Sequence, residues 1–152
     1  MHIVLVEPEI PANTGNISRT CAITNTHLHL VRPLGFSTDD KHLKRAGLDY
    51  WDFLSIDYYD SFQEVKDKYP NGRFFYATTK AKQSYDQIQY LADDFLIFGK
   101  ETAGLPMDLL KANHKYCIRI PMGKNLRSLN LSNSVAIILY EALRQMNFNG
   151  LE

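Results

Sequence analysis

Three polar loops hold the residues of this chain that could do chemistry. Pro11–Asn16 (PANTGN) precedes a predicted helix, whose first N–H groups could bind an anion, and Arg19 follows about one turn later. Gly99–Pro106 has two glycines that flank an acidic residue, and glycine lets a ligand approach the backbone closely. Ile120–Met122, followed by Arg127–Asn133, offers more serine and asparagine side chains than one helix cap requires. All three loops are candidate binding sites.

Other familiar patterns for catalysis are missing from the sequence. The chain lacks the fingerprints G-x-G-x-x-G and G-x-x-x-x-G-K-[ST] for nucleotide phosphates, and the G-x-S-x-G turn of covalent hydrolases. His27 and His29 share one face of a predicted strand, but a zinc site needs a third ligand and the nearby sequence supplies none. Cys21 and Cys117 lie far apart without C-x-x-C spacing. We therefore expect no metal site and two reduced thiols.

The composition is that of one globular domain. The chain has 152 residues, of which 45% are hydrophobic and 22% charged, so we predict a single domain over residues 1–152. No apolar run reaches the roughly 18 residues that a membrane-spanning helix needs. Strand-like residues begin directly after Met1, which leaves no space for a signal peptide. We therefore expect a cytoplasmic protein that does not enter a membrane.

The charges balance overall but are unevenly distributed. Lysine plus arginine and aspartate plus glutamate both number 17, so the whole chain has no basic field that attracts nucleic acid. Residues 109–140 contain five basic and no acidic residues, whereas residues 49–69 contain six acidic and two basic residues. This asymmetry fits two solvated faces, or alternatively one face that binds a polyanion.

Predicted strands and helices alternate along the chain. The apolar run His2–Glu7 predicts a buried parallel strand, and Asn13 is the expected cap of a helix over Thr14–Thr24. Ser61 and Glu64 have the spacing of a capping box that starts another helix, ending before a proline. The order of the elements predicts an α/β fold, a mostly parallel sheet with helices on both faces. The remaining predicted elements are strands over Leu28–Val31, Ser55–Tyr58, Arg73–Thr78, Phe95–Phe98 and Tyr116–Ile120, and helices from Asp39 or Asp40 to Arg45, around Gln83–Tyr90, over Met107–Ala112 and over Leu131–Gln145.

Each polar loop directly follows a predicted strand, which is where open α/β sheets bind ligands. In this order the loops resemble the three motifs of the SPOUT class of S-adenosylmethionine-dependent RNA methyltransferases, in its SpoU-like branch. The matching segments are Asn13–Arg19 (NTGNISR), Phe98–Pro106 (FGKETAGLP), and Ile120–Met122 (IPM) with Ser128–Asn133 (SLNLSN).

The resemblance extends over the whole chain. Glu7–Pro11 and Arg45–Tyr50 look like segments of the small TrmL-type enzymes that methylate the wobble nucleotide of tRNA. The resemblance implies that the C-terminal third forms a deep trefoil knot. It also implies transfer of a methyl group from S-adenosylmethionine to the ribose 2′-OH of nucleotide 34, a cytidine or a modified uridine.

The resemblance further implies roles for individual residues. Arg19 is the implied catalytic residue, acting across a dimer interface on the target ribose and its phosphate. Because arginine stays protonated in proteins, we expect Arg19 to donate hydrogen bonds and stabilise developing alkoxide charge, and not to act as a base. Asn13, Glu101 and Asn130 support the site by shaping the loops or contacting the methionine and ribose groups. The implied cofactor-binding residues are Thr78, Gly99, Ile120, Met122, Ser128 and Leu129.

A catalytic domain that carries its own RNA footprint needs basic residues to bind backbone phosphates, and a homodimer doubles that basic surface. We therefore expect tRNA and a second copy of the chain as partners. The residues expected at the RNA are Lys41, Lys44, Arg45, Lys111, Lys124, Arg127 and Tyr140.

Two functions of other classes stay open on the residues alone. One is an RNA-binding module that keeps the fold and the basic face but transfers nothing, and Arg19 together with the complete third loop argues against it. The other is a small nucleotide-binding enzyme that uses Asn13–Asn16 as a phosphate loop, and the absence of a lysine from that loop argues against it.

Overall fold

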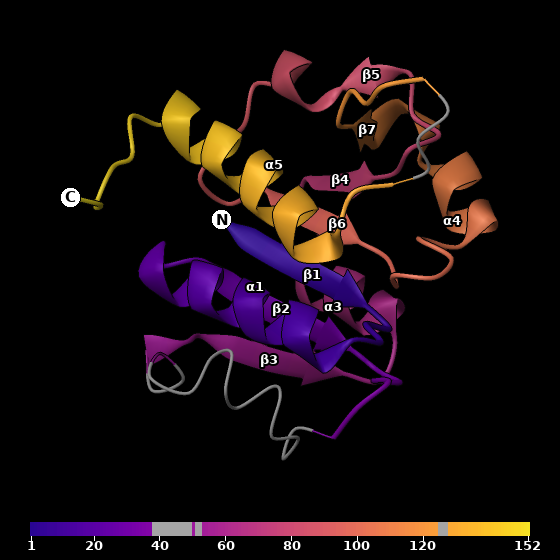
Figure 1. Ribbon diagram of the computed structural model, residues 1–152, viewed down its shortest axis with the longest axis horizontal. Coiled ribbons are helices and arrows are strands. Elements are labelled where there is room, and N and C mark those ends of the chain that lie inside the picture. Colours follow the sequence, from indigo (N-terminus) through magenta and orange to yellow (C-terminus); the bar gives the residue numbers. More distant parts are fainter. Residues whose placement is uncertain (38–49, 51–52, 125–127) are drawn as a thin grey trace.

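A seven-stranded parallel sheet forms the centre of the described structure (Figure 1). The computed structural model describes residues 1–37, 50, 53–124 and 128–152. Within these ranges the strand order is β3-β2-β1-β6-β4-β7-β5, and each neighbouring pair is parallel. The strands are β1 (His2–Val6), β2 (His27–Val31), β3 (Ile56–Tyr59), β4 (Phe74–Ala77), β5 (Gln83–Ser84), β6 (Phe95–Phe98) and β7 (Cys117–Arg119).

Helices cover both faces of the sheet, as the alternation of elements predicts. On one face, α1 (Pro11–Ile23) and α5 (Leu131–Gln145) lie side by side over β1 and β6. On the other face lies α3 (Phe62–Lys68). Helix α4 (Met107–Ala112) lies beyond the carboxyl end of β6. The chain also has the single turns η2 (Tyr85–Gln87) and η3 (His114–Tyr116).

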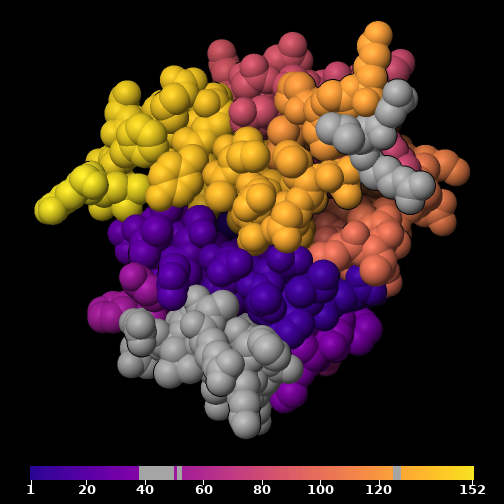
Figure 2. Space-filling model, viewed as in Figure 1, coloured from indigo at the N-terminus to yellow at the C-terminus, as the bar shows by residue number. Residues whose placement is uncertain are grey.

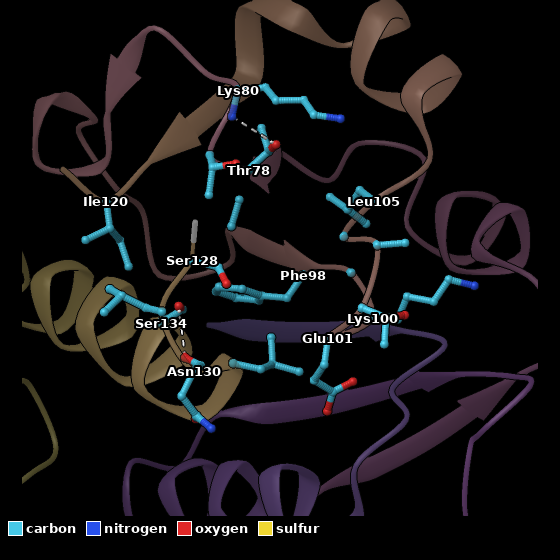
Figure 3. Close-up of a pocket in the computed structure, with 18 of the residues that line it drawn as sticks. Thr78, Lys80, Phe98, Lys100, Glu101, Leu105, Ile120, Ser128, Asn130 and Ser134 are labelled. Atoms are coloured by element: carbon cyan, nitrogen blue, oxygen red, sulfur yellow. Dashed lines mark hydrogen bonds between the residues drawn. The ribbon is translucent and has the colours of Figure 1, made fainter. Parts of the chain in front are cut away.

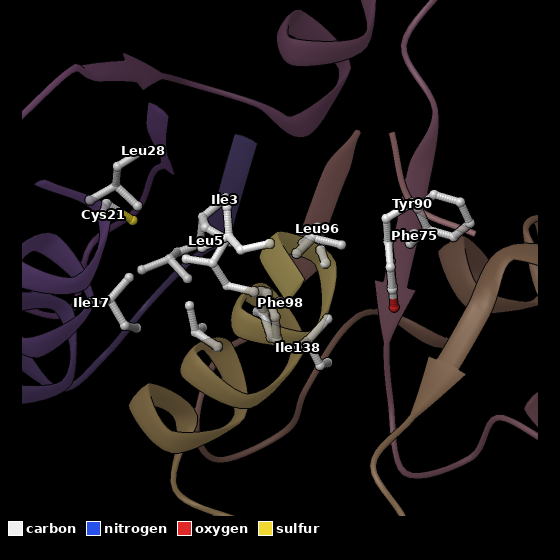
Figure 4. Packing of buried hydrophobic residues seen from close by; sticks show 14 of the residues in the cluster. Ile3, Leu5, Ile17, Cys21, Leu28, Phe75, Tyr90, Leu96, Phe98 and Ile138 are labelled. Atoms are coloured by element: carbon white, nitrogen blue, oxygen red, sulfur yellow. The ribbon is translucent and has the colours of Figure 1, made fainter. Parts of the chain in front are cut away.

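Side chains that alternate along the strands divide the core into two clusters. Ile3 and Leu5 of β1 face α1 and α5, where they pack with Ile17 and Ile138 (Figure 4). Val4 of β1 points the other way, into the cluster that contains one residue from α3 and one from α4. Because β1 is covered on both faces, its sequence is an uninterrupted apolar run and not an alternating one.

The sequence predicts several elements to the residue and misplaces the start of one. Phe95–Phe98, Met107–Ala112 and Leu131–Gln145 have the expected bounds, and other strands shift by one or two residues. The first helix begins at Pro11, which has no N–H to satisfy and suits the first helical position. Asn13 is therefore not its cap, because it lies inside the first turn with its side chain bonded to other loops.

Of the two remaining predicted helices, one is replaced by other structure and one lies outside the described residues. The segment Gln83–Tyr90 was expected to be weakly helical, and it forms the short strand β5 and the turn η2. It pairs with β7 as an edge strand, so tertiary pairing overrides its local helical signal. The basic helix expected up to Arg45 lies outside the described residues. No helix in the described part of the chain is long and apolar enough to cross a membrane.

Candidate functional site

A cavity of about 560 Å³ opens where β4, β6 and β7 end, beside the first turn of α5 (Figure 3). Its volume falls in the range of roughly 300–1,000 Å³ that small-molecule and cofactor sites occupy. The polar groups come from the loops after the strands, and the apolar floor comes from strand and helix side chains such as Phe98 and Ile138. The position is the one that parallel α/β sheets use for ligands.

The structure brings the predicted loops together at this cavity. All six residues implied to bind cofactor line it, as do the three supporting residues. These residues are Thr78, Gly99, Ile120, Met122, Ser128 and Leu129, with Asn13, Glu101 and Asn130.

A chain of hydrogen bonds through Glu101 joins the three loops. The Glu101 carboxylate accepts hydrogen bonds from the backbone N–H groups of Glu9 (2.8 Å) and Ile10 (3.1 Å) and from Asn13 Nδ2 (3.0 Å). Asn130 Nδ2 in turn donates to Asn13 Oδ1 over 2.9 Å. Hydrogen bonds to a charged group each contribute about 1.5–3 kcal/mol, so this carboxylate strongly favours one arrangement of the loops.

Asn130 has a second function as the cap of α5. Its Oδ1 accepts hydrogen bonds from the backbone N–H groups of Ser132 (2.9 Å) and Asn133 (3.4 Å) and from the Ser132 hydroxyl (2.7 Å). The surplus of polar residues in the third loop is thus shared between capping the helix and contacting the first loop.

Two further carboxylates, Glu7 and Glu9, connect the segment before α1 to the second loop. Glu9 Oε2 accepts hydrogen bonds from Thr102 N (3.1 Å) and Oγ1 (2.7 Å), and these bonds hold the pKa of Glu9 below its ordinary value. Lys100 Nζ lies 2.9 Å from Glu7 Oε2, and this bond raises the pKa of the lysine. The segment after β1 and the segment after β6 are therefore connected in both directions.

The two glycines of the second loop meet different steric requirements. A Cβ on Gly99 would lie 2.1 Å from the carbonyl carbon of Gly104, so no side chain fits there. Gly104 has φ of +70°, a left-handed conformation that residues with a side chain rarely adopt. The backbone of this loop doubles back through a bridge between Lys100 and Gly104, in which the Gly104 N–H donates to the Lys100 carbonyl over 2.8 Å.

Sequence reasoning missed part of the cavity wall. Thr79 and Lys80 line it beside Thr78, directly after β4. The rule that ligands bind after strand ends would have found this short polar segment, which contains no glycine. The Lys80 backbone N–H donates to Thr78 Oγ1 over 3.3 Å, whereas its ammonium donates to the sulfur of Met107, which is not among the lining residues. The other lining residues that we did not single out include Ile10, Leu105, Leu110, Ile118, Ser134 and Ile138.

The residues expected at the RNA lie outside the cavity wall or outside the described residues. Arg19 is exposed on α1, with its guanidinium 5.1 Å from the centre of the Tyr50 ring. Tyr140 is exposed on α5, and Lys111 and Lys124 are exposed on α4 and after β7. The positions of Lys41, Lys44, Arg45 and Arg127 lie outside the described residues.

The expectation that His27 and His29 lack a third metal ligand is wrong. Residue 2 pairs with residue 27 in the parallel register of β1 and β2, so His2 stands beside both. One ring nitrogen from each of the three histidines lies within 4.8 Å of the others. Burial lowers the pKa of His2 to about 4 and that of His29 to about 3, so both rings are neutral near pH 7.

Comparison with known proteins identifies the class of this fold and site. The model of the SpoU rRNA Methylase family matches residues 1–140, and the chain belongs to this family. The resemblance drawn from the three loops is thereby confirmed, together with the α/β fold. The trefoil knot stays a prediction that follows from the family.

Within the family, the chain is similar over nearly its full length to tRNA (cytidine(34)-2′-O)-methyltransferases. The enzyme of that name from Yersinia pestis is 49% identical and covers 99% of this chain and 96% of its own length. A relative from Bacillus subtilis (strain 168), to which the same name is given provisionally, is 56% identical over 100% of this chain and 97% of its own length.

Solved structures agree with this placement. A structure determined to study the 2-OH methylation of C/U34 on tRNA has a TM-score of 0.92, is 41% identical, and covers 96% of this chain and 95% of its own. The SpoU methyltransferase AviRb from Streptomyces viridochromogenes, solved with the cofactor AdoMet, shares the fold with a TM-score of 0.84 at 24% identity. It covers 97% of this chain and 58% of its own.

The hydrogen-bond chain predicts energetic coupling between Glu101 and Asn13. Glu101→Gln replaces an acceptor oxygen by an N–H₂ group that faces other donors, so we expect a loss of about 1–3 kcal/mol in the free energy of unfolding. The double variant Glu101→Gln/Asn13→Ala should lose less free energy of unfolding than the sum of the losses in the two single variants, as measured by urea denaturation. Glu152→Gln, at the exposed C-terminus, is the control and should change little. Strict additivity of the two changes would contradict the coupling.

The bonds from Thr102 predict an acid-sensitive contact at Glu9. The folded-state pKa of Glu9 lies below its unfolded value near 4.5, so the contact contributes fully above that pH and is lost as pH falls through the folded pKa. Thr102→Val removes the hydroxyl donor, and the Glu9 pKa measured by NMR titration of the carboxyl carbon should then rise. An unchanged Glu9 pKa in the variant would show that the hydroxyl bond is absent in solution.

Proposed function

We propose that this chain transfers a methyl group from S-adenosylmethionine to the ribose 2′-OH of nucleotide 34, a cytidine or modified uridine, in tRNA. The observation that carries the proposal is full-length similarity to tRNA (cytidine(34)-2′-O)-methyltransferases, combined with the joining of all three motif loops at one cavity. Because the proposed substrate is tRNA, we expect this activity in the cytoplasm.

The cavity suits S-adenosylmethionine in both size and chemistry. Apolar side chains such as Ile120 and Leu129 offer surfaces against which a purine ring can pack, and the strand ends offer backbone N–H and C=O groups for its polar edge. Of the two lysines in the wall, Lys100 is paired with Glu7 and the Lys80 ammonium donates to the sulfur of Met107. When bound, S-adenosylmethionine supplies a methyl group on a sulfonium, which an oxygen nucleophile can accept by in-line displacement.

The chain contributes positioning to this reaction. Six lining residues would hold the cofactor, largely through backbone groups: Thr78, Gly99, Ile120, Met122, Ser128 and Leu129. Glu101, Asn13 and Asn130 hold the loops that carry these groups in one arrangement. Because in-line transfer requires a near-attack geometry, a rigid set of loops supplies much of the acceleration.

Arg19 supplies positive charge for the target nucleotide. Its guanidinium is exposed on α1 and stays protonated, so it can bind the phosphate next to the target ribose and stabilise negative charge that develops on the 2′-oxygen. The Tyr50 ring beneath it limits the directions that the side chain can take.

The exposed face of α1 and α5 fits a homodimer interface. Both helices present a stripe at spacings of three and four residues, Ala12-Asn16-Arg19-Ile23 on α1 and Asn133-Ile137-Tyr140-Arg144 on α5. Ile23 is 49% exposed and Tyr140 42% exposed, and the two helices form one continuous surface (Figure 2). A second copy on this face would bury these apolar side chains and bring Arg19 of one copy to the interface, near the partner. The basic residues Lys111 and Lys124 lie exposed for tRNA phosphates.

Replacement of Arg19 tests the proposed reaction. In Arg19→Ala, binding of S-adenosylmethionine by calorimetry should match the wild type, whereas methyl transfer to tRNA should fall about 100- to 1,000-fold, the usual cost of losing a group that stabilises transition-state charge. Arg32→Ala, an exposed arginine beyond β2, is the control and should keep its activity.

Three results would count against this proposal. Loss of cofactor binding in a folded Arg19→Ala protein would contradict the role of the arginine. Binding of ATP in place of S-adenosylmethionine would favour a phosphate-loop enzyme. Binding of tRNA with no methyl transfer by the wild-type chain would favour an RNA-binding module.

The dimer is tested by placing charge at Ile137, an exposed apolar residue of the stripe on α5. Light scattering should give a mass of two chains for the wild type and one chain for Ile137→Glu, because an unpaired carboxylate is costly to bury. Leu91→Glu, which adds the same charge at a residue that is 54% exposed before the amino end of β6, should remain dimeric. A monomeric wild type would overturn this assignment.

A further inference from the structure

A histidine cluster lies on β1 and β2, at the ends of the strands opposite to the cavity. His2 begins β1, and His27 and His29 lie in β2 with their side chains on the same face of the sheet. His2 Nδ1 is 2.9 Å from His29 Nε2, and the rings of His27 and His29 stack with their centres 4.3 Å apart. Three imidazoles thus meet at one point of a rigid sheet.

The hydrogen bonds around His29 fix which of its nitrogens is free to bind. The Tyr59 hydroxyl donates its single proton to Asp57 Oδ2 (3.3 Å), so it must accept from His29 Nδ1–H, 3.1 Å away. His29 Nε2 therefore carries the lone pair, and it points at His2. Metal-binding histidines typically donate the N–H that does not face the metal to a carboxylate or another polar acceptor. His29 has this arrangement, because its Nδ1–H is bonded to the Tyr59 hydroxyl, which is bonded to Asp57.

We propose that His2, His27 and His29 form a binding site for a divalent transition-metal ion, with Zn²⁺ as the ion that fits best. Imidazole is a preferred ligand of this group of ions, and three protein nitrogens leave one position of a tetrahedral zinc site for water. His2 lines a surface cavity of about 590 Å³ near the amino ends of β4 and β6, and this cavity gives solvent access to the cluster.

Charged groups of both signs lie near this site. His2 lies close to Asp93 and to the N-terminal ammonium, and His29 lies close to Asp57 and Lys68. The Lys68 ammonium is 2.9 Å from Asp57, so these two charges offset each other, and the proposal rests on the three imidazole nitrogens.

Metal binding needs a small rearrangement of the rings and the transfer of one proton. Zinc–nitrogen bonds of about 2.0–2.1 Å in a tetrahedron place the nitrogens about 3.3 Å apart. The His2–His29 pair is near that distance, but the proton of their hydrogen bond lies on His2 Nδ1 and must move to His2 Nε2, and His27 must turn toward the pair. In turning, His27 exchanges its contact with Ser55 Oγ or with Asp57 Oδ2, both 3.1 Å, for the metal.

Calorimetric titration of the untagged full-length chain with ZnCl₂, after treatment with a chelator, tests the site. We expect one ion per chain, and a melting temperature that rises with Zn²⁺. Bound Co²⁺ should give the visible absorption of a tetrahedral site. His2→Ala, a change at a half-buried position on the first strand, should remove all three signals.

Two further variants separate a metal site from a merely structural cluster. Tyr59→Phe keeps the ring packing and removes the group that orients His29, so zinc affinity should fall about 10- to 100-fold. His114→Ala removes an exposed histidine outside the cluster and should bind like the wild type. Wild-type binding no tighter than that of His2→Ala, or binding lost in His114→Ala, would overturn the proposal. S-adenosylmethionine binding should be unchanged in all three variants, so this result is independent of the methyltransferase proposal.

Discussion

The Glu101 carboxylate is the interaction on which the candidate site depends. It belongs to the loop after β6, and it accepts hydrogen bonds from two backbone N–H groups before α1 and from the side-chain amide of Asn13. Asn13 passes the contact to Asn130, which in turn caps α5. Glu101 therefore joins the loop after β6 to the start of α1, and Asn13 and Asn130 extend this connection to the start of α5, the longest helix among the described residues. A carboxylate with this many donors has one low-energy position, which makes the site rigid before any ligand arrives.

The sheet creates the conditions for that network. Strands β1, β6, β4 and β7 are neighbours and parallel, so the segments that follow them all emerge at the same edge. Close approach of those segments requires Gly99, where a Cβ would overlap the backbone of Gly104. The polar contacts and the glycines thus act together, since both allow several backbone segments to pack closely at the end of a buried sheet.

The sequence predicted the parts of the fold that local patterns determine. The bounds of Phe95–Phe98 and Leu131–Gln145 follow from an isolated apolar run and a strongly amphipathic segment, and both match the structure. Asn13 was misassigned because Asn before a helix is an ordinary cap, and only the tertiary position of Glu101 shows what its side chain binds. The histidine cluster escaped notice for a similar reason. His2 and His27 are separated in sequence, and only the register of β1 against β2 makes them neighbours.

The wall of the cavity draws on segments from nearly the whole length of the chain, from Ile10 to Ile138. It therefore does not exist in any partly folded form that lacks the N-terminal loop, the central strands or α5. A ligand that binds only the complete cavity favours the fully folded chain by mass action, and its stabilising effect grows with the logarithm of its concentration. Cofactor supply and the lifetime of the folded protein are in this way linked: a chain that has its ligand is protected from opening at either end.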